Sequence, residues 1–585
     1  MRQRILGKVM PNIATMWVAK DVFPKGMLWT EAREALAKIN RESALITMAM
    51  LNAVCAEFLS PVRTREQARA PDKILPLVNY LFAERERTAA IRIWQNSTGA
   101  FVPVNPQAAV AMTEACMRYC DPIHGVRFEQ PWQHPPFAHI LLSFQEGMMS
   151  DSVLKGPINL AALTDDQFAD FARNYQTANF DSGFWVLMRR HYLMFEKEAN
   201  HGLTRERLGV TPAEWFSRVS GIDPREYRML QLVAIFHSRD FTLDAPDLTK
   251  LVYDLDTALT NMNPDVAAAY KRLHELAVTA VSPPDAQIDD WATAIYHAHY
   301  VRRRPALRLQ GEKYLCLHKQ LFAERFIAAI VHVLADLVVS VQPVGWPAEP
   351  SKRTLQVRTE FGTIFEDYIQ RLVQILFLGS GAVFRYNVKP QGGGECDVLV
   401  VIDGIALAFE VVHHPWSVSE RSRGLPEDFI KHASDNISKA AKLCAELTER
   451  GSLLDDPKVK VSRALPIVIM SEAMPINEMT ASTFHSALAA KIDNSALLGT
   501  ERISPVQSLS VAQLENLDRI KRKRATEIIT FLQQRAADPL ARFTGDSHMG
   551  LKLGEWQKLG DIDEEVHRDV KEHGPKIFKP SVARS

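Results

Sequence analysis

The sequence predicts a multidomain protein with a large all-α N-terminal region and a C-terminal α/β domain of the order helix, three strands, helix, strand. Three observations lead to this fold class. The chain has 585 residues, which is too long for one ordinary core. Apolar residues recur at helical spacing through residues 1–341, whereas short β-rich runs alternate with helical stretches beyond residue 354. Between these parts, residues 342–353 hold three prolines and a glycine, as is typical of a linker.

The N-terminal region, as one unit or as two subdomains, is expected to be helical nearly throughout. Residues 30–59 carry apolar positions three and four apart. Thr211 and Glu214 have the spacing of a capping box, and Gly221 is a suitable end for the helix that they begin. The longest apolar run, residues 326–341, contains two ionisable side chains and is too short for a bilayer, so it predicts a buried helix.

The C-terminal part is predicted as a domain over residues 354–545, followed by a flexible tail over 546–585. Its expected elements begin with a long helix that ends near Gly379 and continue with a second helix after the third strand. The last predicted strand is continuously apolar, as in a parallel strand covered on both faces. The strands are expected at 382–388, 396–402, 405–412 and 464–470.

Composition restricts the function classes. Lysine plus arginine and aspartate plus glutamate both number 69, so any nucleic-acid binding must come from local patches rather than bulk charge. Six cysteines form no disulfide framework, and the first residues do not resemble a signal peptide, so a reducing cytoplasm without membrane association is expected. No P-loop, zinc-protease or serine-hydrolase motif occurs in the sequence.

Two acids face each other in a predicted hairpin. Asp403-Gly404, between two apolar runs, predicts a two-residue type I′ turn. Counting outward from this turn places Asp397 opposite Glu410, where two like charges destabilise a sheet unless one is protonated or a cation lies between them. Mg²⁺ prefers carboxylate oxygens and needs only one or two of them. The alternative is that both acids are solvated at a fraying end of the hairpin.

The element order and three short motifs resemble the PD-(D/E)xK, or restriction-endonuclease-like, phosphodiesterases. "FGTIFEDYI" resembles the first-helix pattern of that superfamily, with Glu366 at its acidic position. "ECDVLVVIDGIALAFEVV" resembles its metal-binding hairpin, with Asp397 and Glu410 as the two acids. "DNISKAAKL" resembles the helix that follows. The resemblance covers roughly residues 354–470.

This resemblance implies a Mg²⁺- or Mn²⁺-dependent nuclease that cleaves phosphodiester bonds in DNA, with prokaryotic restriction or anti-phage defence as the role that it suggests. It implies that Glu366, Asp397, Glu410 and the backbone carbonyl of Val411 hold one or two metal ions. The metal would polarise the scissile phosphate and generate hydroxide from water. The helical region would recognise a target, restrain the nuclease, bind a protein partner or form oligomers, and the sequence leaves these alternatives open.

The chain departs from the superfamily at the position of its catalytic lysine, which is Val412 here. Three side chains are candidates for the missing cation. His414 shares the face of Val412 if the strand continues, whereas His413 points away. Lys439 or Lys431 could instead reach back from the following helix. If none substitutes, the hairpin belongs to an inactive nuclease-like fold that serves nucleic-acid binding or assembly.

Two further segments have open interpretations. The hairpin register places Glu395 opposite Val412, either as another metal ligand or as the entry to the strand. The loop of residues 415–429 carries Arg421 and Arg423, which either contact substrate phosphates or belong to a solvated connector.

Overall fold

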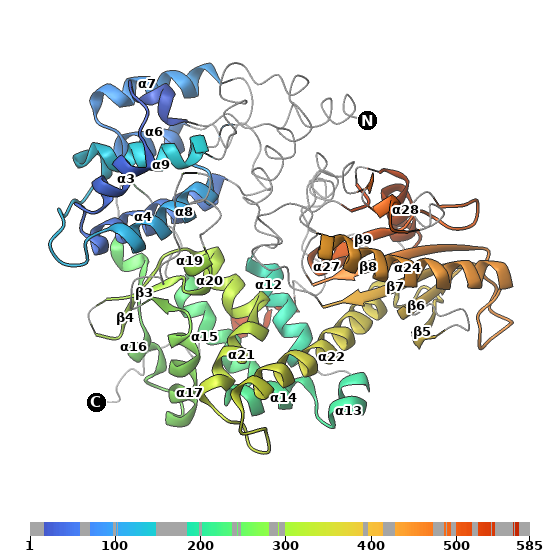
Figure 1. The fold of residues 1–585 in the computed structure, drawn as a ribbon. Coiled ribbons are helices and arrows are strands. Elements are labelled where there is room, and N and C mark those ends of the chain that lie inside the picture. The colour runs from blue at the N-terminus through green and yellow to red at the C-terminus, as the bar shows by residue number, and fades with distance from the viewer. Residues whose placement is uncertain are drawn as a thin grey trace.

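The computed structural model describes most of the chain between residues 17 and 572. The elements lie in three groups: blue helices, a teal-to-green helical group with a small sheet, and a yellow-to-red α/β group (Figure 1). The described residues are 17–58, 71–97, 101, 103–147, 184–197, 202–236, 243, 247–279, 291, 299–309, 311–389, 396–413, 427–471, 485–486, 488–492, 499–517, 525–539, 541–543, 565–566 and 568–572.

The first group is a set of helices around one hydrophobic core. Side chains such as Leu45, Met48 and Phe137 are fully buried in it, because apolar residues at helical spacing line one face of each helix. The helices are α2 (Ala19–Val22), α3 (Trp29–Leu36), α4 (Arg41–Phe58), α6 (Pro71–Leu81), α7 (Glu84–Asn96), α8 (Pro106–Tyr119) and α9 (Pro135–Gly147).

The second group confirms two local predictions. Thr211 and Glu214 form the expected capping box, and Gly221 ends that helix in the left-handed conformation. The apolar run predicted as a buried helix forms a π-helical turn, Glu324–Ala328, followed by α21 (Ile330–Ser340). The other helices are α12 (Phe184–His191), α13 (Gly202–Leu208), α14 (Pro212–Ser220), α15 (Pro224–Phe236), α16 (Leu255–Leu259), α17 (Pro264–Glu275), α19 (His299–Arg303) and α20 (Lys319–Ala323).

The prediction of an all-α N-terminal region is wrong. Residues 252–316 contribute a four-stranded mixed sheet of the order β1-β4-β3-β2. Its strands have two to four residues each, so they are too short to show the alternation by which a strand is recognised in a sequence. They are β1 (Val252–Asp254), β2 (Val278–Thr279), β3 (Ala306–Arg308) and β4 (Lys313–Cys316).

The C-terminal α/β part has the predicted order of helix, three strands, helix and strand. Helix α22 (Pro350–Phe377) precedes the antiparallel strands β5 (Val383–Val388), β6 (Cys396–Ile402) and β7 (Ile405–Val412). Helix α24 (Glu427–Arg450) then leads to β8 (Arg463–Met470), which pairs with β7 in parallel as its continuous apolar run predicts.

One strand of this sheet was not predicted. Strand β9 (Gln507–Ser510) pairs in parallel with β8 and completes the order β5-β6-β7-β8-β9. Its sequence, QSLS, lacks the apolar alternation of a strand, although all four residues are buried. Helices α27 (Val511–Asn516) and α28 (Ala525–Ala537) follow it.

Two helices cover opposite faces of this sheet. Alternate residues of the hairpin, including Leu407 and Phe409, share a core with α22. The intervening residues, including Ala406 and Ala408, pack with Leu443 of α24. The period of two along β7 therefore determines which helix each of its side chains meets.

The helical and α/β parts share one hydrophobic core. That core contains Leu187 of α12 and Leu334 of α21 together with Phe365 of α22 and Ile467 of β8. Helix α22 begins at Pro350, so the end of the expected linker is helical. The division into separate domains at residues 342–353 stays a prediction.

Part of the expected flexible tail is docked on the helical region. Residues 565–566 and 568–572 are helical, and Val566 is buried in the shared core. Asp569 accepts hydrogen bonds from Arg225 at 2.9 Å and from Arg228 at 2.5 Å. Charge pairing and apolar burial thus connect this segment to the helical region, and the prediction of a flexible tail stays a prediction.

The structure also bears on the thiols and on membrane association. All six cysteines are buried and none forms a disulfide, as the composition predicts. Among the helices that the structure describes, none combines the length and apolar character that crossing a lipid bilayer requires.

Candidate active site

The hairpin of β6 and β7 has the predicted turn and register. Asp403 and Gly404 both have positive φ, +49° and +76°, as a type I′ turn requires. Ile402 pairs with Ile405, and the ladder continues as far as Val398 opposite Phe409. The ladder ends there, so the predicted pairing of Asp397 with Glu410 stays a prediction.

Asp397 lies where the ladder ends, and its carboxylate is bound to the neighbouring strand. Oδ2 of Asp397 accepts a hydrogen bond of 2.6 Å from the backbone N–H of Val411. This contact holds the carboxylate beside the residue that follows Glu410. The predicted use of the Val411 carbonyl as a metal ligand stays a prediction.

Glu410 is buried, with 4% of its surface exposed, and it contacts a lysine of the helix that covers its own face of the sheet. Nζ of Lys439 lies 3.3 Å from Oε1 of Glu410. Glu410 continues the face of Ala406 and Ala408, which α24 covers, and Lys439 lies beside the buried stripe of that helix. Strand periodicity and helix packing together thus bring a cation to this acid.

The structure describes only some of the other residues that the sequence predicts for this site. Val412 is buried on the face of Glu410. Lys431 is exposed near the start of α24. His414, Glu395, Arg421 and Arg423 lie outside the described residues, so their predicted roles stay predictions.

Glu366 of α22 is the third predicted acid, and it lies close enough to Asp397 for their charges to interact. Burial, followed by the negative charge of Asp397, raises the pKa of Glu366 to about 7. Its Oε2 accepts a hydrogen bond of 2.9 Å from Nη1 of Arg207, which opposes this rise. The Glu366 side chain is 15% exposed and therefore does not point into open solvent.

The raised pKa of Glu366 predicts a specific dependence of stability on pH. Between pH 4.5 and about 7, Glu366 has lost its proton in the unfolded chain but retains it in the folded protein. The stability that this proton provides is complete below pH 4.5 and is lost as the pH rises through about 7. Glutamine does not titrate, so only wild type loses this contribution as the pH rises. With both proteins in EDTA, the melting temperature of Glu366→Gln should therefore rise relative to that of wild type from pH 5 to pH 8. A difference that stays constant over this range would contradict the shift.

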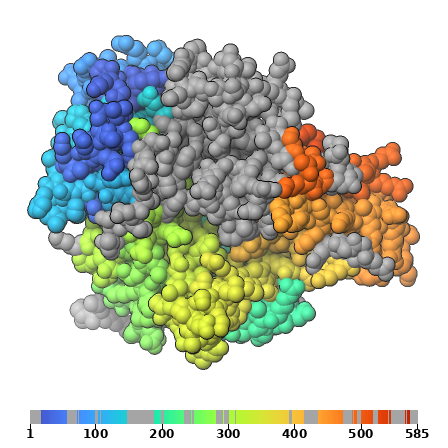
Figure 2. Space-filling view, in the orientation of Figure 1, coloured from blue at the N-terminus to red at the C-terminus, as the bar shows by residue number. Residues whose placement is uncertain are grey.

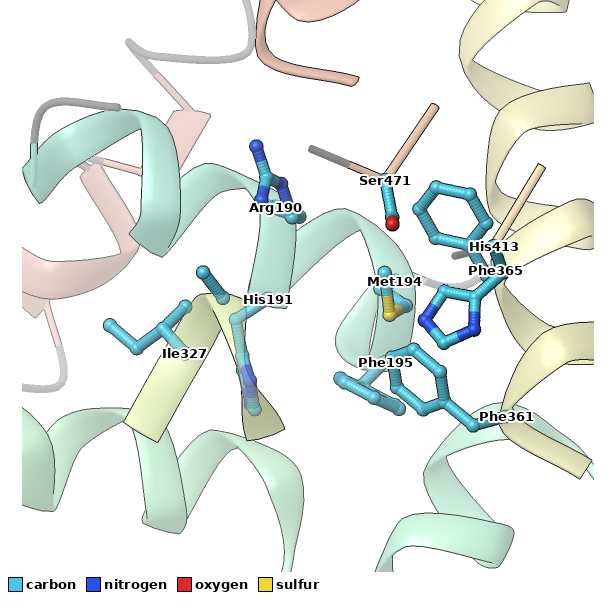
Figure 3. Close-up of a pocket in the computed structure, with 10 residues that line it drawn as sticks. Arg190, His191, Met194, Phe195, Ile327, Phe361, Phe365, His413 and Ser471 are labelled. Carbon is cyan, nitrogen blue, oxygen red and sulfur yellow. The ribbon is translucent and has the colours of Figure 1, made fainter. Parts of the chain in front are cut away.

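His413 points to the opposite face, as predicted. Its ring lies 5.1 Å from the ring of Phe361 and 5.1 Å from that of Phe365, both on α22. Arg190 and Ser471 line the same pocket (Figure 3). The pocket has a volume of about 20 Å³, which suffices for a water molecule but not for a nucleotide.

The acids have the donor chemistry of a Mg²⁺ site, but the described side chains do not gather into one group of three. Among the residues that the structure describes, no group of three or more His, Cys, Asp or Glu side chains is arranged to hold a metal ion. Glu366 interacts with Asp397, and Glu410 is paired with Lys439. Mg²⁺ binds one or two carboxylates and completes its coordination shell with water. The carboxylates of Glu366 and Asp397 are therefore of the right chemical type to hold such an ion.

Sequence reasoning missed the contribution of helix α13. Arg207 and Glu366 are 159 positions apart in the chain, and no local pattern connects them. Thr204 of the same helix is bound to Asp367, the neighbour of Glu366. Comparison of the chain with protein-family models, curated protein sequences and solved structures finds no match.

Proposed function

We propose that this protein is a divalent-metal-dependent nuclease that cleaves phosphodiester bonds in DNA. The observation that carries the proposal is the pairing of Lys439 with Glu410 at 3.3 Å, on the hairpin where Asp397 is held against Val411. A lysine from α24 then takes the place of the cation that PD-(D/E)xK enzymes carry two residues after the second acid. The fold order and the hairpin register support the same assignment.

Each charged side chain has a role in this proposal. Glu366 and Asp397 would hold Mg²⁺ or Mn²⁺, and Glu410 would complete the acidic group. The bound ion supplies a Lewis acid that polarises the phosphate and lowers the pKa of water. Lys439 stabilises negative charge that develops on the phosphoryl oxygens, an interaction that strengthens in the transition state.

The reaction is a hydrolysis. The oxygen of a water molecule bonds to phosphorus, and the bond from phosphorus to the leaving sugar oxygen breaks. The attacking water loses one proton, and the leaving oxygen gains one. Lys439 would orient that water or neutralise the phosphate, a role supported by the hydrogen bond from its ammonium group to Glu410.

A second function is a nuclease-like fold that binds nucleic acid without cleaving it. Val412 at the usual lysine position favours it, and so does the finding that no three acids gather at one point among the described residues. A role in prokaryotic restriction or anti-phage defence is consistent with either function and belongs to the same proposal.

The test compares two matched substitutions in one hairpin. Asp397→Asn should lower Mg²⁺- or Mn²⁺-dependent cleavage of plasmid DNA by at least about 100-fold, because it removes a carboxylate from the metal site. Asp403→Asn makes the same chemical change at the exposed turn, where asparagine tolerates positive φ, and should leave the rate unchanged.

Single-stranded DNA and RNA are assayed beside the plasmid, with EDTA as the metal-free control. Equal rates for wild type and Asp397→Asn would exclude the proposed site. Cleavage of RNA alone would overturn the assignment of DNA as the substrate. Binding of DNA by wild type without cleavage would favour the second function.

A further inference from the structure

Helix α13 of the helical region brings an arginine to the candidate active site. Nη1 of Arg207 donates a 2.9 Å hydrogen bond to Oε2 of Glu366, the acid that interacts with Asp397. Helix α13 packs beside α22 in the ribbon (Figure 1), and the teal part of the chain to which it belongs reaches the surface next to the yellow part (Figure 2). The acidic group is therefore bordered by a residue from outside the α/β part.

A buried contact fixes the position of this helix. Three residues before Arg207, the backbone N–H of Thr204 donates a 3.2 Å hydrogen bond to Oδ2 of Asp367, and the Thr204 hydroxyl donates to the same oxygen. Thr204 is fully buried and Asp367 is 2% exposed. Because Asp367 follows Glu366 directly, this contact places Arg207 beside Glu366 whenever α13 is docked.

The next helix adds a second attachment along α22. Nε1 of Trp215 donates a 2.6 Å hydrogen bond to Glu360, and Arg218 lies 3.5 Å from the same carboxylate. Trp215 is fully buried. Helices α13 and α14 are thus held at two places, nearly two turns apart on α22.

The exposure of the two side chains indicates what Arg207 can reach. The Arg207 side chain is 45% exposed, whereas that of Glu366 is 15% exposed. One N–H group of the guanidinium contacts Glu366, and the planar fork has further N–H groups suited to phosphate oxygens. An anionic phosphate that approaches Glu366, Asp397 and Glu410 needs such positive charge, and Lys439 supplies it beside Glu410.

We propose that Arg207 binds the scissile or an adjacent phosphate of the nucleic acid, so that the active site is complete only when the helical region is docked. This inference rests on the proposed nuclease function. The opposite role, an inhibitory plug on Glu366, is disfavoured by two observations. The Arg207 side chain is 45% exposed, so solvent weakens its pairing with Glu366, and it is a weak competitor for a metal ion. The buried Thr204–Asp367 contact holds α13 in place rather than poised to leave.

The experiment uses the full-length chain and three variants of one helix. Arg207→Ala should lower kcat for DNA cleavage at least about 10-fold, and Arg207→Lys should restore part of the loss, because lysine retains charge without the fork. Arg205→Ala removes the same charge from an exposed position two residues away and should match wild type. The Mg²⁺ concentration for half-maximal rate should not rise in Arg207→Ala, since the Glu366 carboxylate remains.

A binding assay separates this inference from the nuclease proposal. Binding of a fluorescein-labelled duplex is measured by anisotropy in Ca²⁺ at several salt concentrations. The slope of log K against log salt reflects the number of phosphates that the protein contacts. Compared with Arg205→Ala, Arg207→Ala should have a shallower slope, by the amount expected for about one phosphate contact. Asp397→Asn should abolish cleavage and leave this slope unchanged.

Three results would overturn the assignment of Arg207. Rates and salt slopes that agree between Arg207→Ala and Arg205→Ala would show that Arg207 has no contact with phosphate. A faster Arg207→Ala variant would identify Arg207 as a plug. If wild type neither binds nor cleaves DNA, both proposals fail. If wild type binds DNA without cleaving it, the nuclease proposal fails, and the salt slope alone decides whether Arg207 contacts phosphate.

Discussion

Replacing Lys439 with methionine should lower metal-dependent DNA cleavage by about 100-fold or more, and a lysine placed at position 412 in the same variant should restore part of that activity. Lys439 contacts Glu410 at 3.3 Å, and loss of one preorganised positive group from a hydrolytic site costs about 10²–10³ in kcat. Methionine keeps the length of the side chain and removes only its charge.

The rescue follows from the register of β7. Val412 lies two residues after Glu410 and therefore on the same face, which α24 covers. A lysine there starts from the strand rather than from the helix and can bring its ammonium group to the same acid. Val412 is only 6% exposed, so Val412→Lys without the second change should destabilise the protein, because it buries a further positive charge.

Lysine 431 provides the control for this pair of variants. It lies exposed on the same helix, so Lys431→Met removes equal charge away from the hairpin. Steady-state cleavage rates are compared for wild type, Lys439→Met, Lys431→Met and the double variant Lys439→Met/Val412→Lys. Full activity of Lys439→Met would refute the role of Lys439, and a loss only in Lys431→Met would transfer that role to the other lysine.

Removing the carboxylate of Glu515 should lower the free energy of unfolding by about 3–5 kcal/mol, because it leaves Arg190 buried without its counter-charge. Glu515 is fully buried on α27. It accepts hydrogen bonds from Nε and Nη2 of Arg190 at 2.9 and 3.1 Å and from the Tyr368 hydroxyl at 2.5 Å. One carboxylate therefore connects α12 of the helical region with α22 and α27 of the α/β part.

Urea unfolding of Glu515→Ala and of a surface control measures this effect. Glu349→Ala breaks a pair with Lys352 whose side chains are 62% and 63% exposed, and it should cost less than about 1 kcal/mol. The double variant Arg190→Met/Glu515→Leu should recover most of the loss, since apolar replacement of a buried pair is often close to neutral. A loss below about 1 kcal/mol in Glu515→Ala would show that the buried pair does not hold the two parts together.

The sequence alone determined the hairpin and its neighbours because their signals are local. The Asp403-Gly404 turn specifies the pairing of Ile402 with Ile405, and the register that it predicts holds as far as Val398 opposite Phe409. The same alternation predicts that His413 points away from the face of Glu410 and Val412, and its ring contacts Phe361 and Phe365 of α22. Apolar periodicity likewise located the long helix and the strands that carry these residues.

Only the tertiary structure decided which cation meets which acid. Lys439 and Lys431 lie on the same helix, α24, and the packing of that helix on the sheet decides which of them contacts Glu410. Lys439 does so, whereas Lys431 is exposed. Arg207 reaches Glu366 across 159 residues through the docking of α13, and such a contact leaves no trace in local spacing. Short or polar strands such as β9 and the sheet of β1–β4 were missed for the same reason, because burial by distant residues, rather than their own pattern, makes them strands.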